Sequence, residues 1–220
     1  MKPVDALTFD CYGTLIDWYG GVRAAARATA SLAGIEFERF VRDRDLEDRE
    51  LIAGAYQPYS KIVAESARRA AKRQARSITE AEAGAFAASM RHWPPFSESH
   101  AALQRLGTKF RLALLSNVDT ATLEASVALL DVPFEWIVTA EMLHSYKPNP
   151  AHWNEALARL QLEKSRVLHV GSSLFHDMRP AQALGIQTAF VNREVEDLQR
   201  EDEPTFVVPD LTALCTELGV

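Results

Sequence analysis

From about residue 96 onward, the sequence alternates between short apolar segments and helix-like segments, and this alternation restricts the fold more than any other feature. Another short, mostly apolar and strand-prone segment comes at residues 4–9. Short apolar runs separated by helices are typical of parallel strands that are buried on both faces. We therefore expect an α/β fold with a Rossmann-like, doubly wound parallel sheet. The other expected strands are residues 110–115, 136–139, 167–170, 188–191 and 206–208, and the expected helices are residues 99–106, 121–130, 151–160, 181–184 and 211–218.

The segment that follows the first strand is helical in character and contains no convincing strand. Its first helix is rich in Ala and closes on Gly34, a suitable C-cap, and two more helices are expected at residues 36–53 and 58–74. Ser77 and Glu80 have the spacing of a capping box that opens a fourth helix. An all-helical block at this place predicts an insertion over the edge of the sheet. The expected domains are an α/β core of residues 1–17 and 94–220 and a helical cap domain of residues 18–93.

Composition restricts the partners of the chain. The 220 residues carry a net charge of -6, which argues against a general nucleic-acid binder. No apolar run is long enough to cross a membrane, and the N-terminal segment reaches Asp5 and Asp10 too soon for a signal peptide. The two cysteines form no disulfide framework. We expect a cytoplasmic protein with a small-molecule ligand, no nucleic-acid or membrane partner, and a homodimer as the oligomer to consider.

The first expected strand ends at Asp10, and Gly13 and Thr14 then turn the chain. Open α/β sheets bind their ligands at the carboxyl ends of the strands, where this side chain lies. Burial alone would raise the pKa of the carboxyl group, so Asp10 needs nearby donors and a cation to stay ionised. An ionised, partly desolvated carboxylate is a nucleophile. The alternative is an Asp that only caps a turn.

Three more strand ends or following loops carry polar groups. Ser116 and Asn117 offer donors for a bound anion, although either residue could simply be a helix N-cap. Lys147 immediately precedes Pro148 in a proline-stiffened loop before a helix, and it could be a solvated loop lysine or a buried cation. Asp177 follows two serines and could be only a partner of a helix dipole.

The chain contains, in this order, the motifs DCYGTLIDW, LLSNVD, SYKPNP and HVGSSLFHD. Together they resemble the four motifs of the haloacid dehalogenase superfamily over nearly the whole chain. The resemblance implies that Asp10 forms a covalent intermediate and that Lys147 is the cation beside it. It also implies that Asp177 positions or deprotonates water, and that Thr14 and Ser173 fix Asp10 by hydrogen bonds.

Two substitutions point to one branch of this superfamily. Magnesium-dependent phosphatases of the superfamily have an Asp where this chain has Tyr12, and a Gly-Asp pair whose Asp corresponds to Ser172. A halide leaves without being protonated, and its displacement from carbon needs no divalent metal ion. The pattern therefore resembles the (S)-2-haloacid dehalogenases, which implies no metal and no cofactor.

The same resemblance suggests how substrate is bound. Ser116 would hold the substrate carboxylate, while Asn117 and Arg42 would hold the halide, with Arg44 as the nearby competitor of Arg42. Tyr12 and Ser172 would also contact substrate.

Three positions depart from the dehalogenase pattern. Trp153 replaces a Tyr, Leu174 replaces an Asn, and His176 replaces an aromatic residue of the halide pocket. We nevertheless expect Trp153 and His176 to contact substrate.

The expected activity is hydrolysis of a small 2-haloalkanoic acid to a 2-hydroxy acid through an ester of Asp10. The alternatives are a phosphatase of small phosphorylated metabolites, a hydrolase of another small 2-substituted carboxylate, and a non-catalytic relative that binds a metabolite or a protein.

Overall fold

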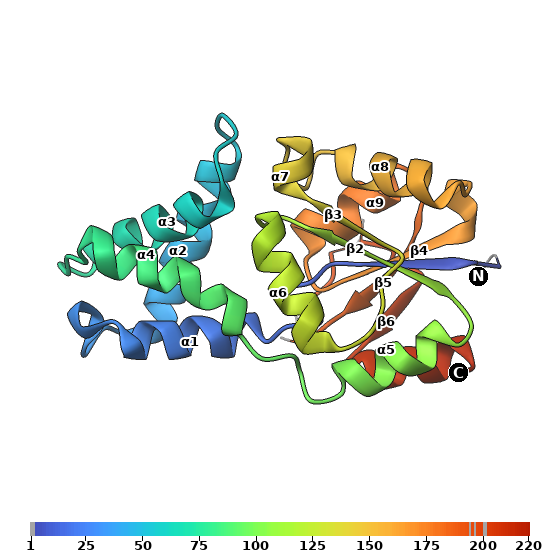
Figure 1. Cartoon of the computed structure of the whole chain (residues 1–220), viewed down its shortest axis with the longest axis horizontal. Coiled ribbons are helices and arrows are strands. Elements are labelled where there is room, and N and C mark those ends of the chain that lie inside the picture. The colour runs from blue at the N-terminus through green and yellow to red at the C-terminus, as the bar shows by residue number, and fades with distance from the viewer. Residues whose placement is uncertain (1–2, 194, 196, 200–201) are drawn as a thin grey trace.

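The computed structural model describes residues 3–193, 195, 197–199 and 202–220. Within these residues, six parallel strands form one sheet in the order β3-β2-β1-β4-β5-β6 (Figure 1). This strand order confirms the predicted doubly wound sheet. The strands are β1 (Ala6–Phe9), β2 (Arg111–Ser116), β3 (Trp136–Thr139), β4 (Val167–Gly171), β5 (Gln187–Val191) and β6 (Phe206–Val208).

Helices cover both faces of this sheet, each over its own hydrophobic core. The larger core contains Leu7 and Phe9 of β1, and the smaller one contains Ala6 of the same strand. Alternate side chains of β1 thus enter opposite cores, which explains why the strand is apolar along its length. One face packs against α5 (Ser99–Gly107), α6 (Thr120–Leu130) and α10 (Leu211–Leu218), and the other against α8 (Ala151–Leu160) and α9 (Arg179–Ala183). The short helix α7 (Ala140–Leu143) contributes to both cores.

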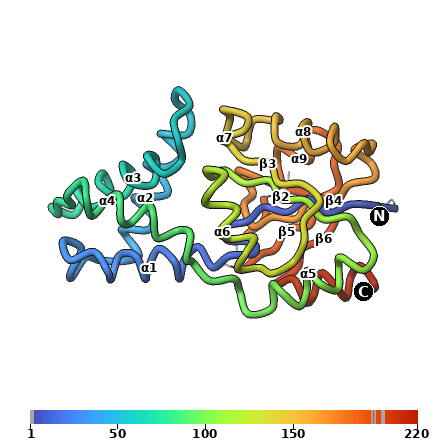
Figure 2. The backbone as a smooth tube through the Cα atoms, viewed as in Figure 1, coloured from blue at the N-terminus to red at the C-terminus, as the bar shows by residue number. Residues whose placement is uncertain are grey.

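The helical insertion, which we define as α1–α4, lies beyond the end of the sheet (Figure 1). The chain enters and leaves it along two neighbouring segments (Figure 2). The backbone N–H of Asp17 donates to the Pro94 carbonyl at 2.9 Å, and that of Phe96 donates to the Leu15 carbonyl at 3.0 Å. The helices are α1 (Trp18–Ala28), α2 (Phe37–Ile52), α3 (Tyr59–Arg73) and α4 (Glu80–Ala88).

Two predicted details of this insertion are wrong. Helix α1 ends at Ala28 rather than at Gly34, and a short 3-10 turn follows it. The capping box uses Thr79 and Glu82, because α4 begins at Glu80 and Glu82 is therefore its third residue.

One prediction in the core also needs correction. Asp177 does not begin a regular helix but lies in a single π-helical turn, Leu174–Met178, and α9 begins at Arg179. Such turns often occur at functional sites. Among the described residues, no helix has the length and apolar character needed to span a membrane.

Candidate active site

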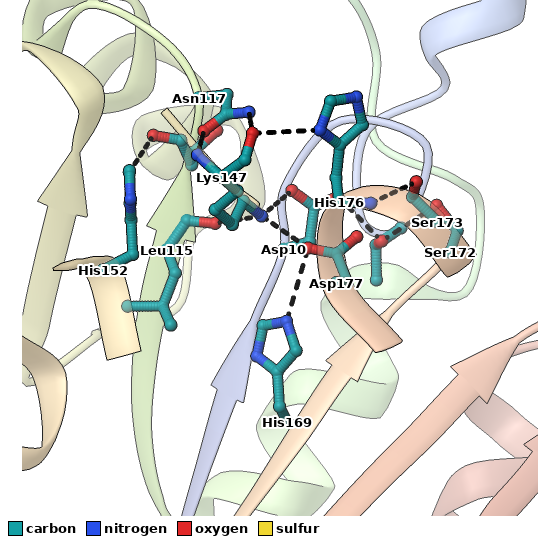
Figure 3. Close-up of polar contacts among 12 residues, drawn as sticks. Asp10, Leu115, Asn117, Lys147, His152, His169, Ser172, Ser173, His176 and Asp177 are labelled. Carbon is teal, nitrogen blue, oxygen red and sulfur yellow. Dashed lines mark hydrogen bonds and ion pairs between the residues drawn. The ribbon is translucent and has the colours of Figure 1, made fainter. Parts of the chain in front are cut away.

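Lys147 is the centre of a buried polar cluster at the carboxyl ends of β1, β2 and β4 (Figure 3). Its Nζ donates to Asp10 Oδ1 at 2.7 Å, to Asp177 Oδ1 at 2.6 Å and to the Leu115 carbonyl at 2.9 Å. The strand order explains the meeting, because β1 lies between β2 and β4 with Phe9 in register with Leu114 and Val170. One ammonium group therefore joins two carboxylates that are far apart in the sequence.

The main chain of Lys147 is held by two side chains. Asn117 accepts from the Lys147 N–H at 2.7 Å and donates to the Lys147 carbonyl at 3.0 Å. His176 Nδ1 lies 3.1 Å from the same carbonyl, so Nδ1 must carry the hydrogen because a carbonyl only accepts. The Asn117 amide thus positions Lys147 with its oxygen and one of its two N–H groups, and its contact with a halide stays a prediction.

Thr14 contacts the other oxygen of Asp10, and Ser172 in turn contacts Thr14. The Thr14 hydroxyl lies 3.0 Å from Asp10 Oδ2 and 3.1 Å from Ser172 Oγ. Ser173 instead accepts from the backbone N–H of His176 at 3.0 Å. The prediction that Ser173 fixes Asp10 is therefore corrected: in this structure Ser173 caps the π-helical turn, and Ser172 is the serine joined to Thr14.

Burial and charge set the protonation of the cluster. Burial, and then the charge of Asp177, raise the pKa of Asp10 against the opposing effect of Lys147. For Asp177, burial is outweighed by Lys147 and His169, which hold the pKa below the usual Asp range. Burial disfavours the ammonium of Lys147, but the two carboxylates outweigh it and raise the pKa of Lys147. The cluster thus carries a charged Lys147, an ionised Asp177 and an Asp10 that is harder to ionise.

A cavity of about 670 Å³ lies between the sheet edge and the helical insertion. Asp10 lines it and is 9% exposed, whereas Lys147 and Asp177 are each 1% exposed. Only the predicted nucleophile of these three thus presents appreciable surface. The other residues that line the cavity include Tyr12, Ser116, Ser172 and His176 from the core and Arg42, Arg44, Asp48 and Tyr59 from the insertion.

The two candidate arginines of α2 differ strongly. The Arg42 side chain is 68% exposed, and its guanidinium lies 3.9 Å from Glu36. Arg44 is fully buried, and its Nε and Nη2 have no hydrogen-bond partner among the described residues. Its Nη2 lies 3.8 Å from Asp48 Oδ1, beyond hydrogen-bond distance. Arg44 is therefore better placed than Arg42 to meet an anion in the cavity.

The two bulky aromatic residues that were expected to contact substrate, Trp153 and Tyr12, lie in different places. Trp153 does not line the cavity but lies in the smaller core, with its ring edge-on to His169 at 5.2 Å. This placement corrects the prediction that Trp153 contacts substrate. Tyr12 does line the cavity, and its hydroxyl lies 2.7 Å from Ser126 Oγ.

Two buried histidines lie behind the cluster, and the sequence did not single them out. His152 Nε2 lies 3.3 Å from the Ser116 carbonyl, and burial followed by the charge of Lys147 lowers the pKa of His152 to about 3. His169 Nε2 lies 3.4 Å from Asp177 Oδ1. The sequence does offer one indication of His169, because it is a His inside the otherwise apolar strand β4.

Comparison with known proteins gives a consistent result. Residues 4–185 match the model of the haloacid dehalogenase-like hydrolase family. The chain is 27% identical to haloacetate dehalogenase H-2 of Moraxella sp. over the full length of both, and 26% identical to (S)-2-haloacid dehalogenase H-109 of Pseudomonas putida over 88% of each. It also superimposes on an L-2-haloacid dehalogenase of Xanthobacter autotrophicus with chloropropionic acid covalently bound, with a TM-score of 0.84, 20% identity and 98% of each chain covered. These findings confirm the resemblance found in the four motifs.

Proposed function

Because the chain belongs to the haloacid dehalogenase-like hydrolase family, we propose that it hydrolyses a small 2-haloalkanoic acid through a covalent ester of Asp10. The observation that carries the proposal is the Asp10 carboxylate, which reaches the cavity while Lys147 and Thr14 bind its two oxygens. The names of the relatives support the choice of a carbon–halogen bond.

In the first half-reaction, a carboxylate oxygen of Asp10 attacks C2 of the substrate. The new bond joins that oxygen to C2, and the carbon–halogen bond breaks with its electron pair leaving on the halide. No proton is needed, because halide ions are very weak bases. Lys147, held by its three acceptors, keeps the carboxylate ionised and in place at the strand end.

In the second half-reaction, water attacks the carbonyl carbon of the Asp10 ester. Asp177 takes a proton from that water, the bond between this carbon and the ester oxygen breaks, and the proton passes from Asp177 to the departing oxygen, which releases the 2-hydroxy acid. The second proton of the water stays on the regenerated Asp10 carboxyl group, which then loses it to solvent. Lys147 and Thr14 already contact the Asp10 oxygens, so both can stabilise the negative charge that develops during the attack.

The departing halide needs a cation or donor on the opposite side of C2. We assign this role to Arg44 in place of Arg42, because a buried guanidinium with two unused donors binds an anion more strongly than an exposed one. Ser116 and neighbouring backbone amides of the cavity would hold the substrate carboxylate.

A magnesium ion, which other members of the superfamily use, does not fit this set of side chains. Asp10 and Asp177 share the ammonium of Lys147, and Tyr12 and Ser172 stand where the phosphatase pattern has two further carboxylates. Magnesium prefers carboxylate and water oxygens. The proposed reaction therefore has no step that involves a metal.

The test is a substrate screen with halogenated short acids and phosphate esters, each assayed with magnesium and with a chelator. We expect halide release from 2-haloacids at equal rates in both conditions. Hydrolysis of phosphate esters that stops in chelator and returns with magnesium would instead establish the phosphatase alternative.

A further inference from the structure

The two oxygens of Asp177 have very different surroundings. Oδ1 accepts from Lys147 Nζ at 2.6 Å and lies 3.4 Å from Nε2 of His169. Oδ2 is buried and has no hydrogen-bond partner among the described residues. Unpaired buried carboxylate oxygens are rare, and at a reaction centre such an atom calls for an explanation.

His169 is held from its far side by Thr8. The two residues are direct neighbours in register on β4 and β1, and Thr8 Oγ1 lies 2.9 Å from His169 Nδ1. Both side chains are buried on the face of the sheet that packs against α8, where Trp153 meets the His169 ring edge-on. The imidazole therefore has a fixed position and two defined partners.

The chemistry of these partners fixes the tautomer of His169. An ionised carboxylate only accepts hydrogen bonds, so the nitrogen that faces Asp177 must be the protonated one. Burial lowers the pKa of His169 although Asp177 opposes the shift, so the ring is neutral and Nδ1 keeps its lone pair. The hydroxyl of Thr8 then donates to Nδ1. The hydrogen bonds run in one direction, from Thr8 through His169 to Asp177.

We infer that Thr8 and His169 are positioning residues which lock Asp177 Oδ1 and so leave Oδ2 as the oxygen that takes a proton from water. The inference rests on the proposed function, since it concerns the hydrolysis of the Asp10 ester. Without the His169 donor, the Asp177 carboxylate can rotate and share Lys147 between both oxygens. Formation of the ester does not use Asp177 as a base, so that step is largely insensitive to His169.

The test is a single-turnover experiment with (S)-2-chloropropionic acid that measures chloride release and the mass of the peptide containing Asp10. His169→Phe removes the donor, and His169→Gln retains an N–H group at a similar reach. Because the 3.4 Å separation is long for a hydrogen bond, we expect ester hydrolysis in His169→Phe to slow by about 10-fold, the lower end for a bond to a charged group. Chloride release should stay near the wild-type rate, the ester should accumulate, and His169→Gln should recover part of the loss.

Thr8→Val provides a second perturbation with a matched control in the same sheet. Thr188 is in register with His169 on β5 and is equally buried, but its hydroxyl has no partner among the described residues. Thr8→Val should slow ester hydrolysis, whereas Thr188→Val should not. If His169→Phe fails to fold, this pair decides the question. Equal slowing of both half-reactions, or equal rates in Thr8→Val and Thr188→Val, would overturn the inference.

A measurement without substrate separates this inference from the proposed function. Nitrogen NMR of the histidine rings reports which ring nitrogen of His169 is protonated. Protonated Nε2 supports the inference, and protonated Nδ1 overturns it. A wild-type protein that releases no halide from any haloacid would refute the proposed function, while the NMR result would still decide the direction of the hydrogen bonds from Thr8 to Asp177.

Discussion

Gly171, the last residue of β4, leaves the space that Asp177 occupies. A Cβ atom at this position would lie 2.7 Å from Asp177 Cβ and 2.8 Å from both its Cγ and Oδ2. Ordinary contacts begin at 3.4 Å, so Gly171→Ala requires Asp177 and the end of β4 to move apart by about 3.4 − 2.7 = 0.7 Å. A displacement of this size lengthens the 2.6 Å contact between Lys147 and Asp177.

We expect Gly171→Ala to slow ester hydrolysis by roughly 10- to 100-fold, since a misplacement of ~1 Å can cost ~10²-fold in rate. Overpacking should also lower the free energy of unfolding by about 1–3 kcal/mol. Gly107→Ala is the matched control, because its Cβ would meet only Leu112 Cδ1 at 3.5 Å, an ordinary contact. Rapid-quench kinetics and thermal unfolding measure the two effects. A folded Gly171→Ala protein with wild-type ester hydrolysis would refute the steric argument.

Three further predictions follow from the charges of the site. Lys147→Met should reduce turnover by at least ~10²-fold, because it removes a donor that stabilises the negative charge developing on the Asp10 oxygen. A wild-type rate would contradict the proposal that Lys147 stabilises this charge. The raised pKa of Asp10 should place the acidic limb of the pH profile of kcat/KM above the usual Asp pKa of 3.8, and a limb at or below 3.8 would contradict this prediction. The free energy of unfolding should fall as the pH rises from 3.8 to the raised pKa, because Asp10 loses its proton more readily in the unfolded chain than in the folded protein. Arg44→Met should lower kcat/KM by about 10- to 100-fold and weaken inhibition by halide, and a larger loss in Arg42→Met would return the halide role to Arg42.

The sheet was predictable because strands such as β1 and β4 are short apolar runs that end in chemically distinctive residues. The meeting of Asp10, Lys147 and Asp177 then followed from the rule that parallel strands end at the same edge of a sheet. The π-helical turn around Asp177 was not predictable, because its sequence fits a helix start equally well.

Side-chain direction was the part that the sequence could not supply. Arg42 and Arg44 are two residues apart on α2 and both line the cavity, but only Arg44 is buried, and neither composition nor spacing says which of the two arginines is the buried one. Ser172 and Ser173 raise the same difficulty in a turn. Trp153 was assigned by its place after Lys147, but the face of α8 that carries it packs into the core.

The central claim is that Asp10 forms an ester whose carbonyl carbon is attacked by water. Single turnover in ¹⁸O-labelled water tests it most directly, with enzyme in excess over (S)-2-chloropropionic acid and mass spectrometry of both the peptide containing Asp10 and the hydroxy acid. The proposed mechanism predicts that the heavy oxygen enters Asp10 in the first turnover and that the first product carries the unlabelled oxygen of the enzyme. Heavy oxygen found only in the first product, with none in Asp10, would mean that water attacks the substrate directly and would contradict the claim.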